Sequence, residues 1–489
     1  MSCVRPAHLF LASTAALATI VAACWDVRTL LFLPLVMSIG TVEAVRRKKL
    51  GKYDFLTGIN FVFALGYAIA PLLVLTAGDE VFFEGLRGAV DRSDDCVIAV
   101  AALSTLGYWA LVLGYAAGGN PRPEVNSPQH GQQPQLAMGL TVAGVFAFFV
   151  GSAAFVLYAT MYGGLIDLLT SAAAIREGEV DVPSRWVFLV HVTPLVLPAT
   201  WWLLWRWKLA LKAGPRLCWL VAFYAALLFA VVTQAATAGR SIILVVIMSA
   251  AMAPFVRTGR LPSLKLAAAL GTIVFAFIIV GKQFFGSLSW GTELEGPQTL
   301  AQDALFAFFR EFTHLYLGIQ NAVQAVPSRL DMRGATDFFV GLQWLLPGEL
   351  FGIRKAPSIA FWNTEISTGV FKSVMPPGLI GYGYYALLFP GIIIIPFLYG
   401  LISGVVENRL IRFWHLDARV SCFYIVCGFA FAYGTMNSDP RVFFVSNFWV
   451  LLLAVGGSLS LAIARRLRAV QPCVSRPRGR LPVAEERAV

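Results

Sequence analysis

Apolar stretches of roughly 18 to 22 residues recur along most of the chain and are separated by polar connections. Helices of that length cross the hydrocarbon core of a bilayer, whereas the strands of a membrane β-barrel are about ten residues long and alternate in polarity. The pattern therefore predicts an all-α polytopic membrane protein with about twelve transmembrane helices. The predicted spans are residues 8–24, 29–45, 55–76, 96–117, 136–158, 186–205, 217–236, 241–256, 264–283, 385–406, 419–436 and 443–464.

Basic residues are concentrated in every second connection between the spans. The segments "RRKKLGK" at 46–52 and "RRLRAVQPCVSRPRGR" at 465–480 are rich in arginine and lysine, whereas "GDEVFFEGLRGAVDRSDD" at 78–95 is acidic. Cytoplasmic connections of membrane proteins carry the excess of Lys and Arg. We therefore expect both termini in the cytoplasm and the acidic connections on the outer side.

The composition agrees with this class of protein. Hydrophobic residues make up 58% of the 489 positions and charged residues 13%, about half the charged share of a soluble domain. The net charge of +11 is explained by basic cytoplasmic connections, so nucleic acid is not an expected partner. The seven cysteines include no CxxC pair, which gives no sign of a disulfide framework or a metal site. Residues 1–24 resemble a signal peptide, but the next apolar run follows so closely that an uncleaved first span is expected.

One predicted connection, residues 284–384, is far longer than the others and is rich in Phe, Trp, Tyr and Leu. Long connections are usually functional or disordered, and this composition favours a folded one. The sequence thus predicts four parts. They are an N-terminal bundle of about nine helices (1–283), a large outer loop with amphipathic helices (284–384), three C-terminal helices (385–464) and a basic cytoplasmic tail (465–489).

Arg240 marks the boundary between a polar connection and an apolar run in "TQAATAGRSIILVVIMSAAMAP", residues 233–254. On the predicted layout it opens a helix at the outer membrane surface. The free N–H groups and positive dipole of a helix start favour an anion there, and Arg240 adds a fixed positive charge. An arginine at this depth can also simply extend its charge to lipid headgroups.

Residues 297–324, "PQTLAQDALFAFFREFTHLYLGIQNAVQ", have the apolar spacing of a helix with one narrow polar stripe. The stripe contains Asp303, Arg310, His314 and Asn321. It indicates either a helix lying at the membrane surface or a row of residues facing the interior of the protein. Arg310 can hold a phosphate with two parallel hydrogen bonds, and His314 or the neighbouring Glu311 can accept a proton from a hydroxyl group.

The remaining candidates follow along the outer loop and in the last outer turn. The stretch "FGIRKAPSIAFWNTEISTGVFKS" at 351–373 combines basic side chains with types that contact sugars, and "PPGLIGYGYYALLFPG" at 376–391 suits a bent helix start with tyrosines at the interface. "MNSDPR" at 436–441 is the last outer turn. The residues expected to bind substrate are Arg354, Lys355, Trp362, Glu365, Lys372, Tyr382 and Arg441.

Three of these features together resemble the bacterial oligosaccharide repeat-unit polymerases, the O-antigen polymerase (Wzy-type) family. They are "AGRS" opening an apolar helix, a single large outer loop late in the chain, and "PPGLIGYGYYALLFPGIIIIPFLYG" leading into the next span. The resemblance covers residues 140–464 in architecture, and its motifs are loose.

The resemblance implies a GT-C-like glycosyltransferase in the bacterial inner membrane that joins undecaprenyl-pyrophosphate-linked oligosaccharides. Donor and acceptor are then both lipid-linked, and no metal or cofactor is needed because the lipid pyrophosphate is the leaving group. A flippase and a chain-length regulator are the implied protein partners. Arg240 and Arg310 match the phosphate-binding arginines of the family by position.

Two alternatives remain open at this point. An O-antigen ligase has a similar outer loop and transfers finished glycan to another acceptor. A flippase or transporter of lipid-linked glycan would also suit about twelve spans, although such proteins carry charged or broken helices near the middle of the membrane.

Overall fold

A computed structural model provides the structure of the chain. It describes residues 19–456 except for 47, 51, 83, 120–132, 178–186, 199, 202–212, 237–239, 275, 277–296, 349–351, 353–354, 372–374 and 414–418. At some further positions, among them Arg240 and Asp303, the backbone alone is described. The described part is helical, apart from a single isolated bridge between Leu50 and Tyr53.

The elements follow one another as short and long helices. In chain order they are η1 (Val27–Phe32), α2 (Leu33–Val45), α3 (Phe55–Phe63), η2 (Ala64–Ile69), α4 (Ala70–Thr76), η3 (Gly78–Val81), η4 (Glu84–Ala89), α5 (Asp94–Ala117), α6 (Gln133–Thr160), α7 (Leu165–Glu177), η5 (Val187–His191), η6 (Thr193–Leu195), α9 (Ala213–Ala236), α10 (Arg240–Thr258), α12 (Pro297–Ala325), α13 (Thr336–Leu345), α14 (Ile359–Thr368), α15 (Gly378–Phe413), α16 (Arg419–Met436) and α17 (Pro440–Ser446).

Six helical stretches among the described residues are long and apolar enough to cross a membrane, so the fold is compatible with an all-α membrane protein. They are Val27–Val45, Phe55–Thr76, Asp94–Ala117, Val142–Thr160, Leu217–Gln234 and Gly378–Arg412. Three more apolar helices, Phe188–Pro198, Leu264–Val274 and Val420–Met436, are shorter. Most of the predicted first span and the end of the predicted last span lie outside the described residues.

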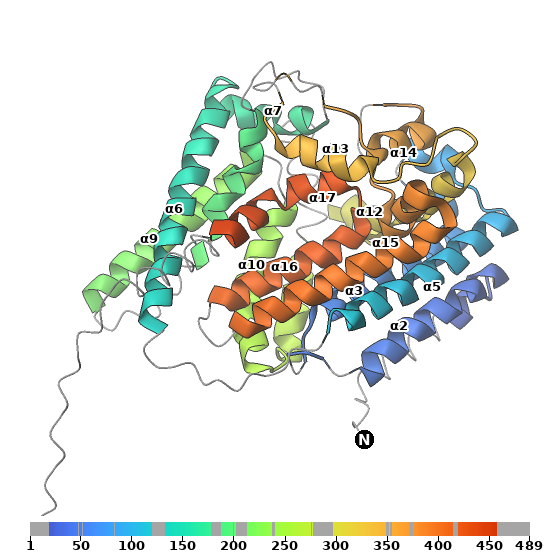
Figure 1. Cartoon of the computed structure of the whole chain (residues 1–489), viewed down its shortest axis with the longest axis horizontal. Coiled ribbons are helices and arrows are strands. Elements are labelled where there is room, and N and C mark those ends of the chain that lie inside the picture. Colours follow the sequence, from blue (N-terminus) through green and yellow to red (C-terminus); the bar gives the residue numbers. More distant parts are fainter. Residues whose placement is uncertain are drawn as a thin grey trace, which may run out of the picture.

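The two ends of the helical bundle carry different connections (Figure 1). Residues 46–54 and 259–263 lie at one end, which we call the basic end, and the Tyr53 hydroxyl donates to the Arg260 carbonyl oxygen there at 2.7 Å. The described residues of 77–93 and 326–377, together with residues 437–439, lie at the opposite end, which we call the loop end. Which of the two ends faces the cytoplasm stays a prediction.

Glycines allow α5 and α15 to touch along their backbones. A Cβ atom on Gly114 would lie 1.9 Å from the Phe397 carbonyl oxygen, and one on Gly400 would lie 2.1 Å from that of Leu111. No side chain fits at such a distance, so only glycine permits this approach. The two helices therefore pack closely side by side from the loop end to the basic end.

The predicted bend at the start of the tenth span is present in α15. Leu387 and Leu388 have non-helical backbone angles, and Leu388 has a φ of 55°. The chain reverses sharply enough there that a Cβ atom on Gly391 would lie 1.8 Å from the Gly383 carbonyl oxygen. The short first part of α15 thus belongs to the loop end, and the longer second part runs through the bundle.

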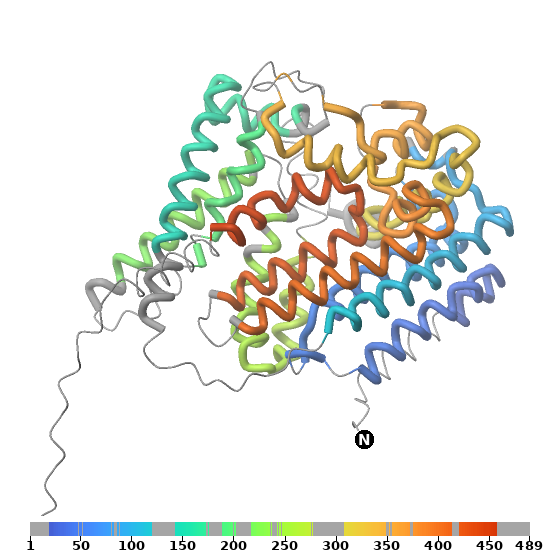
Figure 2. The backbone as a smooth tube through the Cα atoms, in the orientation of Figure 1, coloured from blue at the N-terminus to red at the C-terminus, as the bar shows by residue number. Residues whose placement is uncertain are grey.

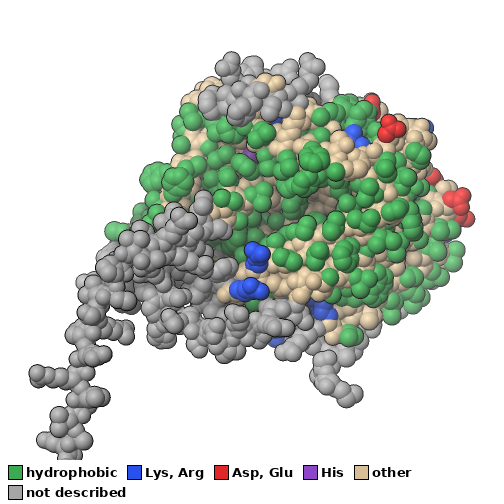
Figure 3. All heavy atoms as spheres, viewed as in Figure 1, with side chains coloured by type: hydrophobic (Ala, Val, Ile, Leu, Met, Phe, Trp, Pro, Cys, Tyr) green, Lys and Arg blue, Asp and Glu red, His purple; other side chains and the backbone are tan. Residues whose placement is uncertain are grey.

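The helices α6, α7 and α9 stand beside the main bundle, and α10 connects them to it by packing against both α9 and α16 (Figure 2). Much of the described surface in the space-filling view consists of hydrophobic side chains, as expected for a surface that faces lipid (Figure 3).

Candidate functional site

The predicted polar helix is α12, and of its stripe Asn321 is buried whereas Arg310 and His314 are half-buried. The connection 77–93 covers the helix, because the Gln320 amide nitrogen donates to the Ala89 carbonyl oxygen at 2.7 Å and the Tyr316 hydroxyl donates to that of Asp91 at 2.8 Å. Asn321 is 2% exposed. At Asn321 the stripe therefore faces the interior of the protein, which is one of the two arrangements that the sequence left open.

Asn321 serves to dock α14 on α12. Its amide nitrogen donates to the Asn363 side-chain oxygen at 3.0 Å and to the Ser367 hydroxyl at 2.6 Å. The Tyr385 hydroxyl donates to the same Asn363 oxygen at 3.2 Å, and the Asn363 amide nitrogen donates to the Met375 carbonyl oxygen at 2.9 Å. All of these side-chain groups are occupied within the protein, so this part of the stripe has a structural role.

Among the described residues of the stripe, His314 has a ring nitrogen without a hydrogen-bond partner. Its Nε2 atom is sealed from solvent and has no hydrogen-bond partner in the described structure, whereas the ring also forms a hydrogen bond with the Met436 backbone. Burial lowers the pKa of His314, and the nearby Glu311 carboxylate acts in the opposite direction. His314 is therefore neutral at pH 7. Glu311 and Arg310 are half-buried on the same helix.

A second group of predicted residues meets between α13, α14 and α17. The Arg441 guanidinium lies 3.9 Å from the centre of the Trp344 ring and 4.7 Å from that of Phe361. The Lys355 Nζ atom lies 4.8 Å from the centre of the same Trp344 ring. We call these four residues the cation–aromatic cluster. It places two positive charges on one aromatic surface at the loop end, where each is held by attraction to the face of a ring.

The guanidinium of Arg441 lacks acceptors on two of its nitrogens. Nε and Nη1 are buried and make no hydrogen bond within the described structure. The neighbouring Asp439 carboxylate is used elsewhere, since it accepts from the backbone nitrogens of Ala360 at 2.9 Å and Arg441 at 2.7 Å and so caps α17. Burial lowers the pKa of Arg441 to about 10, although Asp439 opposes this shift, and burial raises the pKa of Asp439. Buried donors without acceptors are rare, and they suit an anionic ligand.

Aromatic rings continue from the cluster across α14. Phe361 lies 6.5 Å from Trp344 and 5.6 Å from Phe371, and Phe371 lies 5.1 Å from Trp362, with each distance measured between ring centres. The indole Nε1 of Trp362 is buried and has no acceptor among the described residues. The rings of Trp344, Phe361, Phe371 and Trp362 thus form a continuous aromatic row beside the two cations.

The other predicted site residues are dispersed or lie outside the described part. Glu365 is half-buried on α14, and Tyr382 is buried in the first part of α15, where it packs with Trp362. Arg240 opens α10, as predicted, but its side chain is not described; Arg354 and Lys372 are not described at all.

The sequence did not predict the two rings on which Arg441 lies, Trp344 and Phe361. It also missed the ion pair in which Arg333 donates to Asp337 at 2.8 and 3.0 Å and through which Asp337 holds the start of α14. The i,i+4 spacing of Arg333 and Asp337 on a turn into a helix was a usable signal for that pair.

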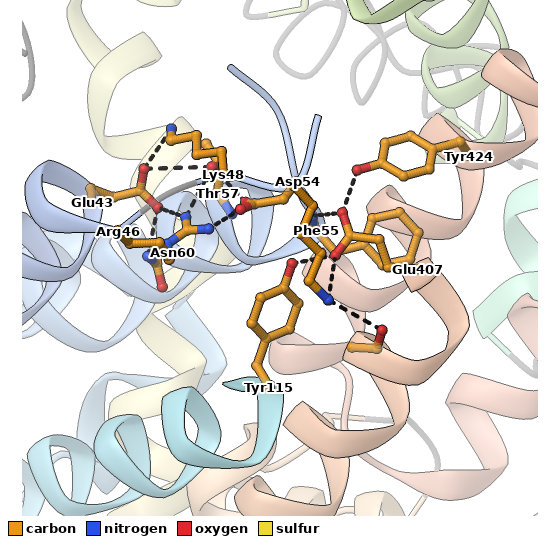
Figure 4. A network of polar contacts seen from close by, with 12 residues as sticks. Glu43, Arg46, Lys48, Asp54, Phe55, Thr57, Asn60, Tyr115, Glu407 and Tyr424 are labelled. Atoms are coloured by element: carbon orange, nitrogen blue, oxygen red, sulfur yellow. Dashed lines mark hydrogen bonds and ion pairs between the residues drawn. The ribbon is translucent and has the colours of Figure 1, made fainter. Parts of the chain in front are cut away.

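The basic end contains a buried charge network that the sequence reading also missed (Figure 4). In its first part, Glu43 pairs with Arg46 and, at 2.7 Å, with the Lys48 Nζ atom. Arg46 pairs in turn with Asp54, whose side chain is 1% exposed and caps α3 by accepting from the Thr57 backbone nitrogen at 2.9 Å. Arg46 and Lys48 of the "RRKK" segment thus have carboxylate partners inside the protein.

The second part of the network is centred on Glu407 of α15, whose side chain is 0% exposed. Its carboxylate accepts from the hydroxyls of Tyr115 and Tyr424 and from the Phe55 backbone nitrogen at 3.0 Å, and it lies 3.4 Å from the Lys49 Nζ atom. Lys48 and Lys49 are adjacent in the chain and pair with carboxylates on different helices, so the connection 46–54 is anchored to both α2 and α15.

Comparisons with known proteins leave the family open. No protein-family model, no curated protein and no solved structure matches the chain. Among the residues that the structure describes, no group of three or more His, Cys, Asp or Glu side chains is placed to hold a metal ion.

Proposed function

We propose that the protein is a membrane glycosyltransferase that polymerises undecaprenyl-pyrophosphate-linked oligosaccharide repeat units. The reaction would take place at the loop end, facing the periplasm of a bacterial inner membrane. The observation that carries the proposal is the Arg441 guanidinium, which lies on two aromatic rings with two buried nitrogens that have no acceptor. Such a group is suited to a phosphate at the membrane surface, and Lys355 on the same ring adds a second charge.

In this proposal Arg441 and Lys355 bind the pyrophosphate of the donor, with Arg240 and Arg310 as further predicted phosphate contacts. A hydroxyl oxygen of the acceptor sugar forms a bond to the anomeric carbon of the donor sugar, and the bond between that carbon and the pyrophosphate oxygen breaks. The lipid pyrophosphate leaves with the electron pair, and the cations stabilise the charge that develops on it. The hydroxyl proton goes to a base, for which neutral His314 is the candidate on α12.

The test is a deletion strain in which surface polysaccharide is separated by length on a gel. We expect the ladder of long chains to disappear while single repeat units remain, because donor synthesis and export are intact. Loss of all surface glycan would favour a flippase or a ligase instead, and it would contradict the polymerase.

The role of Arg441 is tested in the same strain with Arg441→Lys and Arg441→Gln, at matched protein levels. Arg87→Gln is the control, since Arg87 is an exposed arginine on the same end of the protein. We expect both Arg441 variants to lose the ladder, because lysine keeps the charge but cannot form two parallel hydrogen bonds. A normal ladder with Arg441→Gln would show that Arg441 does not bind the donor.

A further inference from the structure

The exposed charges at the basic end are all of one sign in the part of the chain that the structure describes. Arg257 and Arg260 lie at the end of α10, Lys265 lies just beyond, and Arg409 and Arg412 occupy the last turns of α15. All five side chains are exposed. They form no salt bridge within the described structure, so their charges face outward.

The carboxylates at this end are withdrawn from the surface. Glu43, Asp54 and Glu407 are the described acidic residues there, and each is engaged in the buried network with Arg46, Lys48 or Lys49. In a network with equal numbers of acids and bases the buried charges cancel. Within the described structure, the positive charges of the exposed bases are therefore not neutralised by carboxylates of the protein.

Contacts of Lys49 and Tyr53 place the exposed bases of α10 and α15 at the same end of the bundle. The Tyr53 hydroxyl donates to the Arg260 carbonyl oxygen, and the Lys49 Nζ atom lies 3.4 Å from Glu407, which precedes Arg409 by two residues and Arg412 by five. Helix α16 packs against both α10 and α15. We call the face formed by Arg257, Arg260, Lys265, Arg409 and Arg412 the basic face.

We propose that the basic face is a binding site for the headgroups of anionic phospholipids. The occupant follows from position and charge: Arg409 and Arg412 end α15, one of the stretches long and apolar enough to cross a membrane, and α10 ends at the same end of the bundle, where the phosphate groups of a leaflet lie. The exposed flanks of the same helices carry apolar residues such as Ile402 and Val405, which are 54% and 39% exposed and suit acyl chains. A soluble acidic partner would not require that apolar continuation.

The proposal is tested with the purified full-length chain in phosphatidylcholine nanodiscs that contain increasing fractions of phosphatidylglycerol. Binding of a fluorescent phosphatidylglycerol is measured for the parent, for Arg257→Gln/Arg260→Gln and for Arg409→Gln/Arg412→Gln. Each base near a lipid surface contributes about fivefold to affinity, so each pair should weaken binding about 25-fold.

Two further variants test whether binding depends on the positive charge of the basic face. Arg409→Lys/Arg412→Lys keeps the charge and should retain binding, whereas the loop-end pair Arg87→Gln/Arg329→Gln should bind phosphatidylglycerol as the parent does. Parental affinity in both glutamine pairs of the basic face would overturn the proposal. So would protection of this face by poly-glutamate without any preference for phosphatidylglycerol, because the occupant would then be a soluble acidic partner.

Discussion

Replacement of Glu407 by glutamine would leave the Lys49 ammonium buried without its counter-charge. The side chain of Lys49 is 4% exposed, and once the carboxylate is gone its direct contacts within the described structure are the Gly404 carbonyl oxygen at 3.3 Å and the face of the Tyr115 ring. Removing one partner of a buried ion pair typically costs about 3–5 kcal/mol. We expect Glu407→Gln to lie at the upper end of this range because a tyrosine ring and one carbonyl cannot replace a charge.

Replacement of Lys49 should destabilise the protein less than replacement of Glu407. In Lys49→Met, Glu407 keeps two tyrosine hydroxyls and a backbone nitrogen as donors, which stabilise the carboxylate without the lysine. We therefore expect Lys49→Met to lower the free energy of unfolding by about 3 kcal/mol, near the lower end of the range for a broken buried ion pair. The double variant contains neither buried charge, so its loss of unfolding free energy should be smaller than the sum of the two single losses. The difference, which is the coupling energy between the two residues, should reach roughly 2–3 kcal/mol.

The free energies are measured by SDS-induced unfolding of the purified protein in mixed micelles. Lys265→Met serves as the control, since Lys265 is exposed at the same end and its removal should change stability by less than about 0.5 kcal/mol. Additive losses in the double variant, or a Glu407→Gln protein as stable as the control, would refute the reasoning that the pair is buried and coupled.

Three further predictions concern other parts of the fold. Gly114→Ala should destabilise the protein by about 1–3 kcal/mol because its Cβ would meet the Phe397 carbonyl oxygen, whereas Gly271→Ala, which has open space around it, should be neutral or stabilising in the same unfolding assay. Stability should fall as the pH drops below about 6.5, because unfolded His314 binds a proton that the folded residue resists; His314→Gln should flatten this dependence, and an unchanged pH profile would contradict it. Asp439→Ala should cost about 0.5–2 kcal/mol through loss of the α17 cap, and hydrogen exchange at the start of α17 should speed up accordingly, while unchanged protection there would exclude a capping role.

Local patterns along the sequence were sufficient to predict several elements. The apolar spacing predicted α12, the polar-to-apolar boundary predicted a helix that opens at Arg240, and the glycines and prolines near residue 385 predicted the bend in α15. The predicted span 186–205 is less regular in the structure, because the described apolar helix Phe188–Pro198 begins with the 3₁₀ helices η5 and η6. Pro194 lies at the start of η6, and proline removes a backbone donor and disfavours a continuous α-helix.

Contacts between distant segments could not be read in the same way. Lys49 was predicted as a base in a cytoplasmic connection, and nothing near it in the chain reveals that Glu407 is its partner. A glutamate within the apolar run "LISGVVENRL" was the visible signal, since a charge in a span usually has a partner. Arg441 was predicted as a site residue, but the two rings beneath it come from α13 and α14, which only the tertiary fold brings together.

The break in α15 makes the folding of that helix depend on a segment that is synthesised earlier. The backbone nitrogens of Arg333 and Gly334 donate to the Tyr385 and Ala386 carbonyl oxygens at 2.9 and 2.8 Å, which the broken helix would otherwise leave without partners. During synthesis, residues 333–334 leave the ribosome before α15 does. On the predicted layout they must then cross the bilayer before α15 inserts, so a chain whose loop failed to cross would leave the Tyr385 and Ala386 carbonyl oxygens without these donors.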